Sequence, residues 1–314
     1  MGVTLVTGAY GLLGSGIQKH LSPDTSVFPT RSELDYSSVD DIKSYIEGNN
    51  VDKVIHLAAK VGGVKANMKN QFSFYHYNSV MNNNILEACI SQKVKKLVCC
   101  LSTCVYPDQE YINYPLTENQ LHLGPPHSSN FGYAYSKRMV DVQIRAAREQ
   151  YGVDYISVIP NNLYGEVDNF DLENSHVIPA LIRKIWEAKI NNRPSFEVWG
   201  DGMVYREFTY APDAAKAILF CLDKYSHPAP INIGNTQEFL LKDVIQIIKT
   251  CLDYEGDIVF DTSKPKGQIR KPSSNSKLID LGWNTSNYIS LQKGLKNTCE
   301  WFKINYPHNV RGLR

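Results

Sequence analysis

Tyr133 and Lys137 are the pair of residues in this chain whose types and spacing most directly suggest chemistry. Two side chains four residues apart on a helix share one face, with Cβ atoms roughly 5–6 Å apart. An ammonium that close favours the phenolate and should lower the pKa of the Tyr133 phenol. Such a tyrosine can pass a proton to a carbonyl oxygen while a hydride reaches the carbonyl carbon. Taken alone, the Tyr-x-x-x-Lys spacing is more typical of a solvated pair on a helix surface.

A serine and a cysteine upstream favour a catalytic role for this pair over a solvated surface pair. The apolar residues 95–101 predict a buried strand, and Ser102 and Cys104 follow its end. Open α/β sheets bind ligands at the carboxyl ends of their strands, so we expect Ser102 to hydrogen-bond a substrate carbonyl beside Tyr133. Tyr135 lies in the same predicted helix but at the wrong spacing from the lysine. The sequence therefore favours a Ser–Tyr–Lys reductase site.

Three glycines near the N-terminus indicate where a cofactor binds. They follow the short apolar stretch 3–7 and precede the helical stretch 15–21, which predicts a strand, a tight turn and a helix start. Glycines in such a turn let a pyrophosphate approach the backbone, and the helix N-terminus faces the phosphates. An ordinary glycine-rich turn is the alternative. The predicted cofactor contacts in this turn are Gly8, Tyr10, Gly11, Leu12, Leu13 and Gly14.

Arg31 follows the second predicted strand, residues 26–30, where the adenosine ribose of a dinucleotide should lie. NAD-binding folds usually place an aspartate or a glutamate at this point. An arginine can instead pair with a 2′-phosphate, so the sequence favours NADPH over NADH. Glu33 and Asp35 are near enough in sequence to keep NADH open as an alternative.

The first half of the chain alternates between strand and helix patterns. Further strands are expected at residues 53–59 and 154–160, and helices at residues 40–47, 72–91 and 131–151. This alternation predicts an α/β fold with a Rossmann, doubly wound parallel sheet. One strand ends in Leu57, Ala58 and Ala59, where the backbone can approach the cofactor. Asn78 either orients the active site or is one of many asparagines in a polar stretch.

From about residue 166 the pattern changes to shorter, mixed elements. We expect helices at residues 177–189, 213–222, 240–252 and 290–306, and strands at residues 196–200 and 206–210. The prediction is an NADP-binding Rossmann domain, residues 1–165, followed by residues 166–314 as mainly a smaller, mixed α/β substrate lobe. The helix at residues 213–222 is expected to pack back on the first domain.

The composition is that of an ordinary globular chain and disfavours several classes of function. Of 314 residues, 43% are hydrophobic and the formal net charge is +1, so nothing favours nucleic acid or a membrane surface as a partner. No stretch approaches the roughly 20 apolar residues that span a bilayer, and the start does not resemble a signal peptide. The seven cysteines lack metal-ligand spacing, which predicts reduced thiols in the cytoplasm and no metal site.

Several longer motifs carry a resemblance to a known family. They are HLAAKVGG (56–63), STCVYP (102–107), GPPHSSNFGYAYSK (124–137), PNNLYG (160–165), SHVIPA (175–180) and SSNSKL (273–278). They extend over nearly the whole chain, and STCVYP followed by SHVIP is far more specific than the glycine spacing. The chain resembles the extended short-chain dehydrogenase/reductases and, within them, the GDP-4-keto-6-deoxymannose epimerase/reductases.

The resemblance implies roles for five residues. Ser102, Tyr133 and Lys137 correspond to the reductase triad of the family, Cys104 to the base of an epimerisation, and His176 to its acid partner. A 4-keto group acidifies the protons at C3 and C5 of a sugar, so a base and an acid on opposite faces can invert both centres. Ser102 and Tyr133 would stabilise the developing oxyanion. Without the resemblance, a small buried cysteine and a helix-start histidine would be the simpler interpretation.

The resemblance also implies contacts with both ligands. Residues expected beside the nicotinamide are Pro160, Asn161, Asn162 and Leu163, together with Lys137 and His176. Residues expected against the nucleotide sugar are Lys184, Trp199, Arg206 and Lys266. Arg206 suits a diphosphate, and Trp199 offers a planar surface. Two positions depart from the family: Tyr205 replaces a second arginine, and Lys266 replaces an acid, which leaves the preference for GDP open.

Taken together, the resemblance implies an NADPH-dependent enzyme that converts GDP-4-keto-6-deoxy-D-mannose to GDP-L-fucose by double epimerisation and reduction. Family members pair through two long helices, which correspond here to residues 72–91 and 131–151, so a homodimer is implied. One alternative keeps the fold and a single activity, as a nucleotide-sugar 4-ketoreductase or epimerase. An alternative of another class is a non-catalytic protein that binds NADP(H) as a sensor or scaffold. The intact set of five site residues argues against that last alternative.

Overall fold

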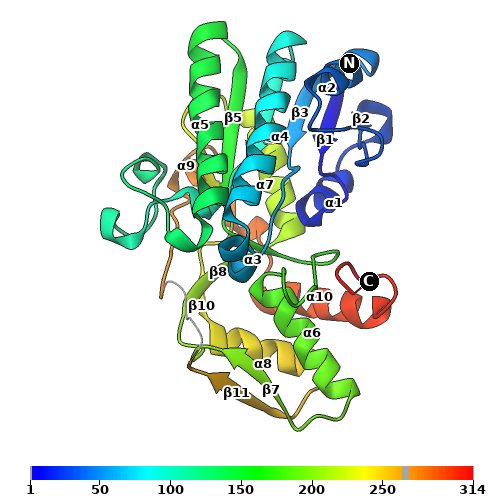
Figure 1. Cartoon of the computed structure of the whole chain (residues 1–314), viewed down its shortest axis with the longest axis vertical. Coiled ribbons are helices and arrows are strands. Elements are labelled where there is room, and N and C mark those ends of the chain that lie inside the picture. The colour runs from blue at the N-terminus through cyan, green and yellow to red at the C-terminus, as the bar shows by residue number, and fades with distance from the viewer. Residues whose placement is uncertain (1, 264–268, 314) are drawn as a thin grey trace.

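The computed structural model describes residues 2–263 and 269–313, and Figure 1 shows a large sheet with helices on both faces beside a smaller lobe. The strands are β1 (Val3–Thr7), β2 (Ser26–Val27), β3 (Val51–His56), β4 (Lys96–Cys100), β5 (Asp154–Pro160), β6 (Asn162–Tyr164), β7 (Ser195–Trp199), β8 (Tyr205–Tyr210), β9 (Ile231–Ile233), β10 (Glu238–Leu240) and β11 (Asp257–Asp261). The helices are α1 (Leu12–Gln18), α2 (Val39–Gly48), α3 (Val64–Lys69), α4 (Gln71–Ser91), α5 (Phe131–Tyr151), α6 (Val177–Ile190), α7 (Ala211–Lys224), α8 (Leu241–Cys251), α9 (Ser276–Asp280) and α10 (Leu291–Asn305).

The large sheet is parallel and has the strand order β2-β1-β3-β4-β5-β9. Because β2 and β3 lie on opposite sides of β1, the winding reverses beside β1, and ligands bind at such a point in open α/β sheets. The predicted Rossmann fold is confirmed. The second strand is shorter than expected, because Thr30 already begins a turn in which its N–H and hydroxyl both donate to Glu33, at 2.8 and 2.7 Å.

Alternation along the buried strands distributes the core between two faces of the sheet. Leu5, Val54 and Leu97 pack with residues of α2, α4 and α5 in one apolar cluster. Their neighbours Val6, Ile55 and Val98 pack with residues of α1 and α7 in another. Since helices cover both faces, adjacent residues in the middle of each of these strands are apolar. The sequence therefore shows continuous apolar runs at the inner strands rather than strict alternation.

A buried polar network fixes the carboxyl ends of β1 and β3 against α4. The Thr7 hydroxyl accepts hydrogen bonds from the N–H groups of Leu57 and Ala58, both at 3.1 Å, so its own proton is directed to Nδ1 of His56 at 2.8 Å. The other ring nitrogen of His56 then donates to Oδ1 of Asn82 at 3.0 Å. Burial lowers the pKa of His56 to about 3, which keeps the imidazole neutral. The end of the sheet where ligands bind is thereby held rigidly.

The smaller lobe contains two small sheets. β8 pairs in parallel with β6 and antiparallel with β10, while β7 and β11 form a separate parallel pair. Helices α6, α8 and α10 share one apolar cluster with these strands. In α8 the buried residues are Leu241, Val244, Ile245 and Ile248, which is the spacing of one helix face. The predicted smaller, mixed lobe is confirmed.

Two elements from the second half of the chain return to the large sheet. α7 packs against α1 closely enough that a Cβ on Gly16 would lie 3.0 Å from the Cβ of Ala215. β9 then joins the sheet beside β5. The chain therefore crosses between the two parts more than once, and a division at residue 165 stays a prediction.

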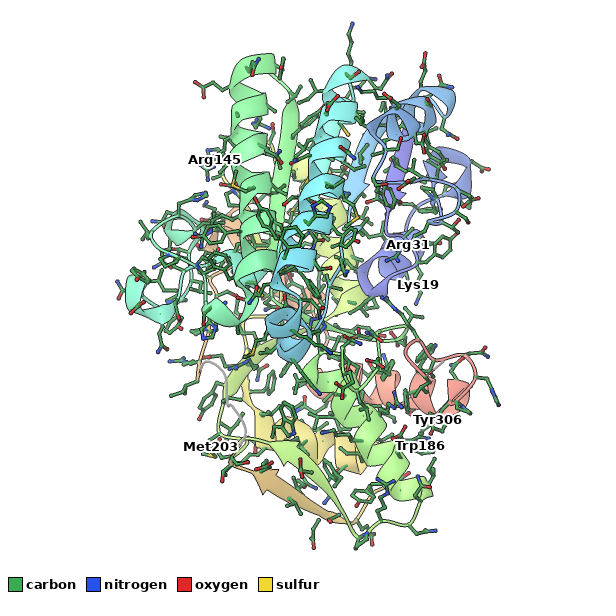
Figure 2. The ribbon with its side chains drawn as sticks, viewed as in Figure 1. Lys19, Arg31, Arg145, Trp186, Met203 and Tyr306 are labelled. Atoms are coloured by element: carbon green, nitrogen blue, oxygen red, sulfur yellow. The ribbon has the colours of Figure 1, made fainter. Side chains whose placement is uncertain are left out.

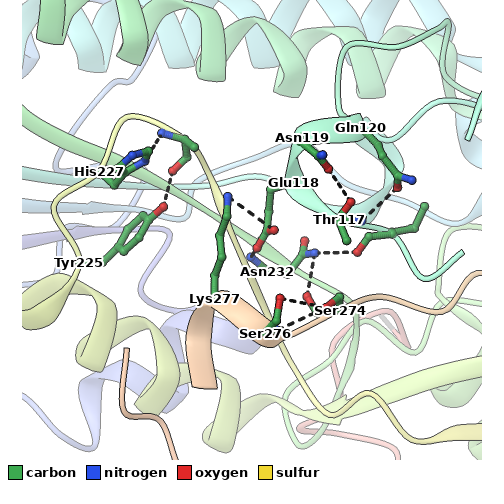
Figure 3. A network of polar contacts seen from close by, with 12 residues as sticks. Thr117, Glu118, Asn119, Gln120, Tyr225, His227, Asn232, Ser274, Ser276 and Lys277 are labelled. Carbon is green, nitrogen blue, oxygen red and sulfur yellow. Dashed lines mark hydrogen bonds and ion pairs between the residues drawn. The ribbon is translucent and has the colours of Figure 1, made fainter. Parts of the chain in front are cut away.

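A charged cluster closes the sheet at β9, as Figure 3 shows. The buried Glu118 accepts a hydrogen bond from the N–H of Asn232, in β9, at 2.9 Å, and pairs with Lys277 of α9 at 3.6 Å. The Asn232 amide in turn donates to the carbonyls of Leu116 and Ser274 at 3.1 and 3.0 Å. This last strand is short, and these contacts hold it to the loops on its outer side.

Residues 2–263 and 269–313 contain neither a membrane-spanning helix nor a cluster of metal-ligating side chains. No helix in that part of the chain combines the length and the apolar character needed to cross a membrane. Within the same residues, no three His, Cys, Asp or Glu side chains gather in a way that could hold a metal ion.

Candidate active site

Tyr133 and Lys137 lie in the first two turns of α5 and are both buried, unlike a solvated surface pair. The Lys137 ammonium donates a hydrogen bond to the carbonyl of Cys100, at the end of β4, at 2.8 Å. The Tyr133 ring packs edge-on against Phe74 of α4, with ring centroids 6.4 Å apart. The start of α5 therefore presents the pair at the carboxyl edge of the sheet.

Burial decides the protonation of this pair. It raises the pKa of Tyr133 well above its usual value, and the nearby thiols of Cys104 and Cys100 act in the same direction. It also lowers the pKa of Lys137. The prediction that Lys137 lowers the pKa of the phenol is wrong here, because desolvation of the phenolate sets the direction of the shift. Tyr133 is thus neutral at physiological pH, which is the form that donates a proton.

Ser102 and Cys104 lie in the turn that follows β4. Ser102 begins a short 3-10 turn, Thr103–Val105, and its Oγ accepts a hydrogen bond from the N–H of Cys104 at 3.4 Å. The Cys104 side chain packs against Tyr133 in a small cluster that also contains Phe74. The structure therefore brings both residues to the edge where the tyrosine and the lysine lie. Their catalytic roles stay predictions.

His176 stands at the start of α6, on a loop that packs against the loop after β3. The N–H of Gly63 donates to the carbonyl of Asn174 at 2.9 Å, and a Cβ on Gly63 would lie 2.4 Å from the carbonyl oxygen of Ser175. Only glycine allows this approach. His176 keeps access to solvent, yet the protein around it lowers its pKa by desolvation, so its imidazole is neutral at physiological pH. Its role as acid partner stays a prediction.

Lys271 is a site residue that sequence reasoning missed. It lies near enough to Cys104, Arg206 and Asp108 for their charges to affect its pKa, which burial lowers. Burial also lowers the pKa of Arg206, whose guanidinium donates to the carbonyl of Tyr205 at 2.7 Å. Two neighbouring cations beside the cysteine suit an anionic diphosphate. The only signal in the sequence is a basic pair, which is common on protein surfaces.

Lys184 and Trp199 lie on the small lobe, on α6 and β7. The Lys184 ammonium donates to the backbone carbonyl of Glu197 at 3.2 Å. The Trp199 side chain is 44% exposed, and the Lys65 ammonium lies 6.0 Å from its ring centroid. The structure therefore brings these two predicted substrate contacts to neighbouring elements. Lys266 lies outside the described residues, so its contact stays a prediction.

The glycine turn after β1 fits a dinucleotide. Gly8 has φ +68°, and a Cβ there would lie 2.8 Å from the backbone nitrogen of Ala58, so the two strand ends meet with no room for a side chain. A Cβ on Gly14 would lie 2.4 Å from the Gly8 carbonyl oxygen, which lets α1 start directly against the turn. No side chain caps the first turn of α1, so its N–H groups are open to a phosphate. Tyr10 is exposed beside this turn, whereas Leu13 is buried and offers only its backbone.

Arg31 is exposed next to this turn, and Figure 2 shows it beside α1 with Lys19. Its charge reaches the phenol of Tyr36, which lies near the N–H of Gly8. The two acidic neighbours are engaged locally: Glu33 accepts from Thr30, and Asp35 accepts from the N–H and hydroxyl of Ser37 at 2.8 and 2.7 Å. Both carboxylates are thus oriented by their own loop, and the exposed guanidinium is the cation beside the glycine turn.

Asn78 has a clear structural task in holding the loop after β3. Its amide oxygen accepts from the N–H of Lys60 at 2.8 Å, and its amide nitrogen donates to the Lys60 carbonyl at 2.9 Å and the Phe74 carbonyl at 2.7 Å. Lys60 directly follows the predicted cofactor contacts Leu57, Ala58 and Ala59. Asn78 therefore fixes the backbone of this loop, and its role in orienting the active site stays a prediction.

The segment after β5 is also held by side chains. The Asn161 amide donates to Glu207 at 3.2 Å and to the carbonyl of Asn235 at 2.8 Å, and its oxygen accepts from Thr209 at 2.6 Å. Its side chain thus serves to join β5 to β8. Among its neighbours, Pro160 is buried and Leu163 partly buried, whereas Asn162 is exposed. Their predicted contacts with a nicotinamide stay predictions.

Comparisons with known proteins agree with this geometry. The family model for the NAD dependent epimerase/dehydratase family matches residues 4–234. A GDP-L-fucose synthase from Dictyostelium discoideum is 42% identical over 309 residues, covering 96% of this chain and 95% of that protein. The crystal structure of a GDP-L-fucose synthetase from Naegleria fowleri bound to NADP is 40% identical, with a TM-score of 0.90 over 99% of this chain and 95% of that one.

A second solved structure, of a protein with a different activity, has a lower sequence identity to this chain. A GDP-6-OMe-4-keto-L-xylo-heptose reductase from C. jejuni is 26% identical, with a TM-score of 0.87 over 97% of this chain and 98% of that one. It shares the architecture, but its identity to this chain is well below that of the two proteins above. The chain belongs to the NAD-dependent epimerase/dehydratase family and, within it, to the GDP-L-fucose synthases.

Proposed function

We propose that the chain converts GDP-4-keto-6-deoxy-D-mannose to GDP-L-fucose, first epimerising C3 and C5 and then reducing C4. The observation that carries this proposal is that Cys104 lies against Tyr133 at the same sheet edge as Ser102 and Lys137. A base for epimerisation and a proton donor for reduction can thus address one sugar. The full-length similarity to GDP-L-fucose synthases supports this choice of substrate.

Epimerisation requires a proton to leave one face of a carbon and another to arrive on the opposite face. The Cys104 thiolate takes the proton from C3 or C5, and the electron pair moves to the carbonyl oxygen at C4; the thiol so formed returns its proton to solvent before the next abstraction. The hydroxyls of Ser102 and Tyr133 donate hydrogen bonds to that oxygen as its charge develops. His176 supplies the proton on the other face in its imidazolium form; because its lowered pKa leaves the resting ring neutral, that form must be regenerated from solvent in each cycle. Its remaining access to solvent is consistent with this.

The reduction acts on the same carbonyl, whose oxygen at C4 carries the developing charge during epimerisation. Bound NADPH supplies a hydride to C4 of the sugar. Tyr133, which burial keeps neutral, gives its phenolic proton to the oxygen of the former carbonyl. Lys137 lies one helical turn along α5, fixed on the Cys100 carbonyl, where its positive charge can stabilise the phenolate that remains. Arg206 and Lys271 would hold the diphosphate of the substrate through charge-assisted hydrogen bonds.

The preference for NADPH follows from local charges. Glu33 and Asp35 are each held by two hydrogen bonds to one carboxylate oxygen within their own loop. Arg31, exposed beside the glycine turn, can meet a 2′-phosphate instead. Binding of NADH is disfavoured, because NADH has no 2′-phosphate to pair with the Arg31 guanidinium.

We propose that two chains pair through α4 and α5. These helices lie side by side and expose the apolar residues Phe72, Tyr75, Met139 and Val142. Sedimentation should give twice the mass of one chain, and replacing Met139 and Val142 together by glutamate should give the monomer. Ile304→Glu, which changes an exposed isoleucine on α10, should leave the mass unchanged. A wild-type chain that sediments as a monomer would remove this part of the proposal.

The decisive experiment combines the substrate with NADPH in heavy water. Oxidation of NADPH reports reduction, and NMR of the product reports deuterium at C3 and C5. The proposal expects GDP-L-fucose carrying deuterium at both carbons. A reduced product without deuterium at these carbons would leave only a 4-ketoreductase. If NADPH binds but no nucleotide sugar is turned over, the chain is a binding protein.

A further inference from the structure

Two cysteines of the smaller lobe meet where α8 ends against α10 (Figure 1). Cys251 is the last residue of α8, and Cys299 lies in the middle of α10. The Lys303 ammonium donates to the backbone carbonyl of Cys251 at 3.4 Å. Because Lys303 follows Cys299 by one helical turn, both side chains lie on the face of α10 that meets Cys251. The two thiols are hydrogen-bonded there, with Cys299 as the donor, and they are not covalently linked.

The two thiols differ in their access to solvent. Cys299 is completely buried in the apolar cluster of the smaller lobe, together with Ile248 and Leu252. Cys251 packs against the same cluster but is only partly buried. An oxidant in solution therefore meets Cys251 first, and Cys299 lies directly behind it.

The surroundings of Cys251 favour its thiolate. The hydrogen bond from Cys299 lowers the pKa of the Cys251 thiol, and the ammonium groups of Lys303 and Lys296 act in the same direction. Burial and the charge of Glu300 oppose this shift without reversing it. Since the thiolate is the nucleophilic form of a cysteine, Cys251 is prepared to react with an electrophile.

The buried cysteines of the large sheet and its covering helix have the opposite character. Burial raises the pKa of Cys99 and of Cys221 to about 12, and that of Cys100 to about 11. These groups stay protonated at physiological pH and are poor nucleophiles. A low pKa, partial exposure and a second cysteine at hand are the properties of a redox-sensing cysteine, and Cys251 combines all three.

We propose that Cys251 and Cys299 form a reversible oxidation site that a hydroperoxide converts to an intrachain disulfide. The Cys251 thiolate attacks the terminal oxygen of the hydroperoxide, the O–O bond breaks, and an alkoxide leaves and takes up the proton that Cys251 gave up. The sulfur of Cys299 then attacks the resulting sulfenic acid, and water leaves with the proton of the second thiol. In sum, two thiols lose two electrons and two protons, and the hydroperoxide becomes an alcohol and water.

The disulfide joins two helices that support the substrate side of the smaller lobe. α8 starts directly after β10, in which Phe239 pairs with Arg206 of β8. α10 packs against both α8 and β8. A link between Cys251 and Cys299 also restricts the unfolded chain, so the oxidised protein should be more stable than the reduced one. This site is independent of the proposed reaction, because neither cysteine lies at the edge of the large sheet.

The test treats the full chain with hydrogen peroxide, blocks the remaining thiols with iodoacetamide and maps the peptides by mass spectrometry. The wild-type chain should lose the thiols of Cys251 and Cys299 together and yield one linked peptide pair, which dithiothreitol separates again. The melting temperature should rise by about 5 °C on oxidation and return on reduction. Cys104→Ser, which removes a cysteine of the candidate active site, should form the same link.

Two variants separate the steps of the oxidation. Cys299→Ser should stop at the sulfenic acid, which dimedone traps on Cys251, whereas Cys251→Ser should leave Cys299 as a free thiol. Oxidation of Cys251 to a sulfinic acid without a linked peptide in the wild-type chain would overturn the proposal. So would a Cys251 thiol that peroxide leaves unchanged. Neither result bears on the proposed reaction, whose test is made in the absence of peroxide.

Discussion

The two ends of the candidate site are built in different ways. At the sheet edge, Tyr133 and Lys137 are buried, and their pKa values are shifted by desolvation. On the small lobe, Trp199 lies on the exposed face of β7. The first end is held by contacts among α4, α5 and the end of β4, whereas the second depends on two short strands. In the proposed assignment, the reacting groups are therefore buried where the protein shifts their pKa values, and the substrate contacts of the small lobe are on an exposed face.

This difference predicts how variants should behave. Removing a buried group at the sheet edge should lower the turnover rate with little change in ligand affinity, because that group acts on the reacting atoms. Removing an exposed charge should change affinity and selectivity with little change in the rate at saturation.

The largest effect is expected for Tyr133→Phe. The change keeps the ring against Phe74 and removes only the hydroxyl, so the proton donor is lost while the packing stays. The turnover rate should fall by about 10²–10⁴-fold, the usual contribution of general acid catalysis. Tyr135→Phe, two residues along the same helix, should keep the wild-type rate. NADPH oxidation measures the rate, and equal loss in both variants would contradict the assignment.

Cys104→Ser should separate the two reactions. Without NADPH, the wild-type chain should exchange the C3 and C5 protons of the keto sugar for deuterium. The variant should slow this exchange by about 10²–10⁴-fold, because a hydroxyl is a far weaker base than a thiolate. NMR follows the exchange, and fluorescence should show unchanged NADPH binding. Cys251→Ser, which changes a partly buried cysteine of the small lobe, is the matched control. Normal exchange in Cys104→Ser would exclude Cys104 as the base.

Arg31→Ala should change cofactor selectivity rather than rate. Losing a charge-assisted contact should lower the affinity for NADPH by about tenfold to a hundredfold and leave the affinity for NADH nearly unchanged. Lys19→Ala removes another exposed cation beside α1 and should preserve the preference. Binding titrations with both cofactors give the ratio. If Arg31→Ala weakens NADPH and NADH equally, the guanidinium does not meet the 2′-phosphate.

The last prediction concerns stability rather than activity, at Asp168 in the loop between β6 and α6. Burial raises the pKa of Asp168 to about 7, although its carboxylate accepts a hydrogen bond from the N–H of Asn169 at 2.7 Å. Between the pKa of an unfolded aspartate and about 7, the folded chain holds a proton that the unfolded chain has lost. Stability should therefore fall as pH rises through this window, by up to about 1.4 kcal/mol per pH unit from this group.

Thermal unfolding at pH 5 to 7.5 measures this slope. Asp168→Asn cannot ionise, so its melting temperature should change less with pH than that of the wild-type chain. Asp257→Asn, at an exposed position, should retain the wild-type slope. Equal slopes in all three proteins would show that Asp168 is ionised in the folded chain throughout this range.

Much of the sheet edge could be predicted because its signals are local. The spacing from Tyr133 to Lys137 lies within one helix, and Ser102 and Cys104 directly follow one strand, so their order alone brings them to the same edge. The glycine turn was equally readable, because its context is a strand on one side and a helix on the other. Lys271 could not be predicted in the same way, since a basic residue after a loop gives no sign of which strand end it approaches.

Burial was the other property that the sequence did not reveal. From spacing alone, Lys137 should lower the pKa of Tyr133, but packing around α5 raises it. The residue types, their order along the chain and the periodicity of the strands determined the fold class and the reactive groups. Only the tertiary structure decided which groups are desolvated and that Cys251 meets Cys299 where α8 ends against α10. The physical reason is that solvent exclusion and the meeting of distant helices depend on the whole packed chain, whereas helix and strand periodicity depends on near neighbours.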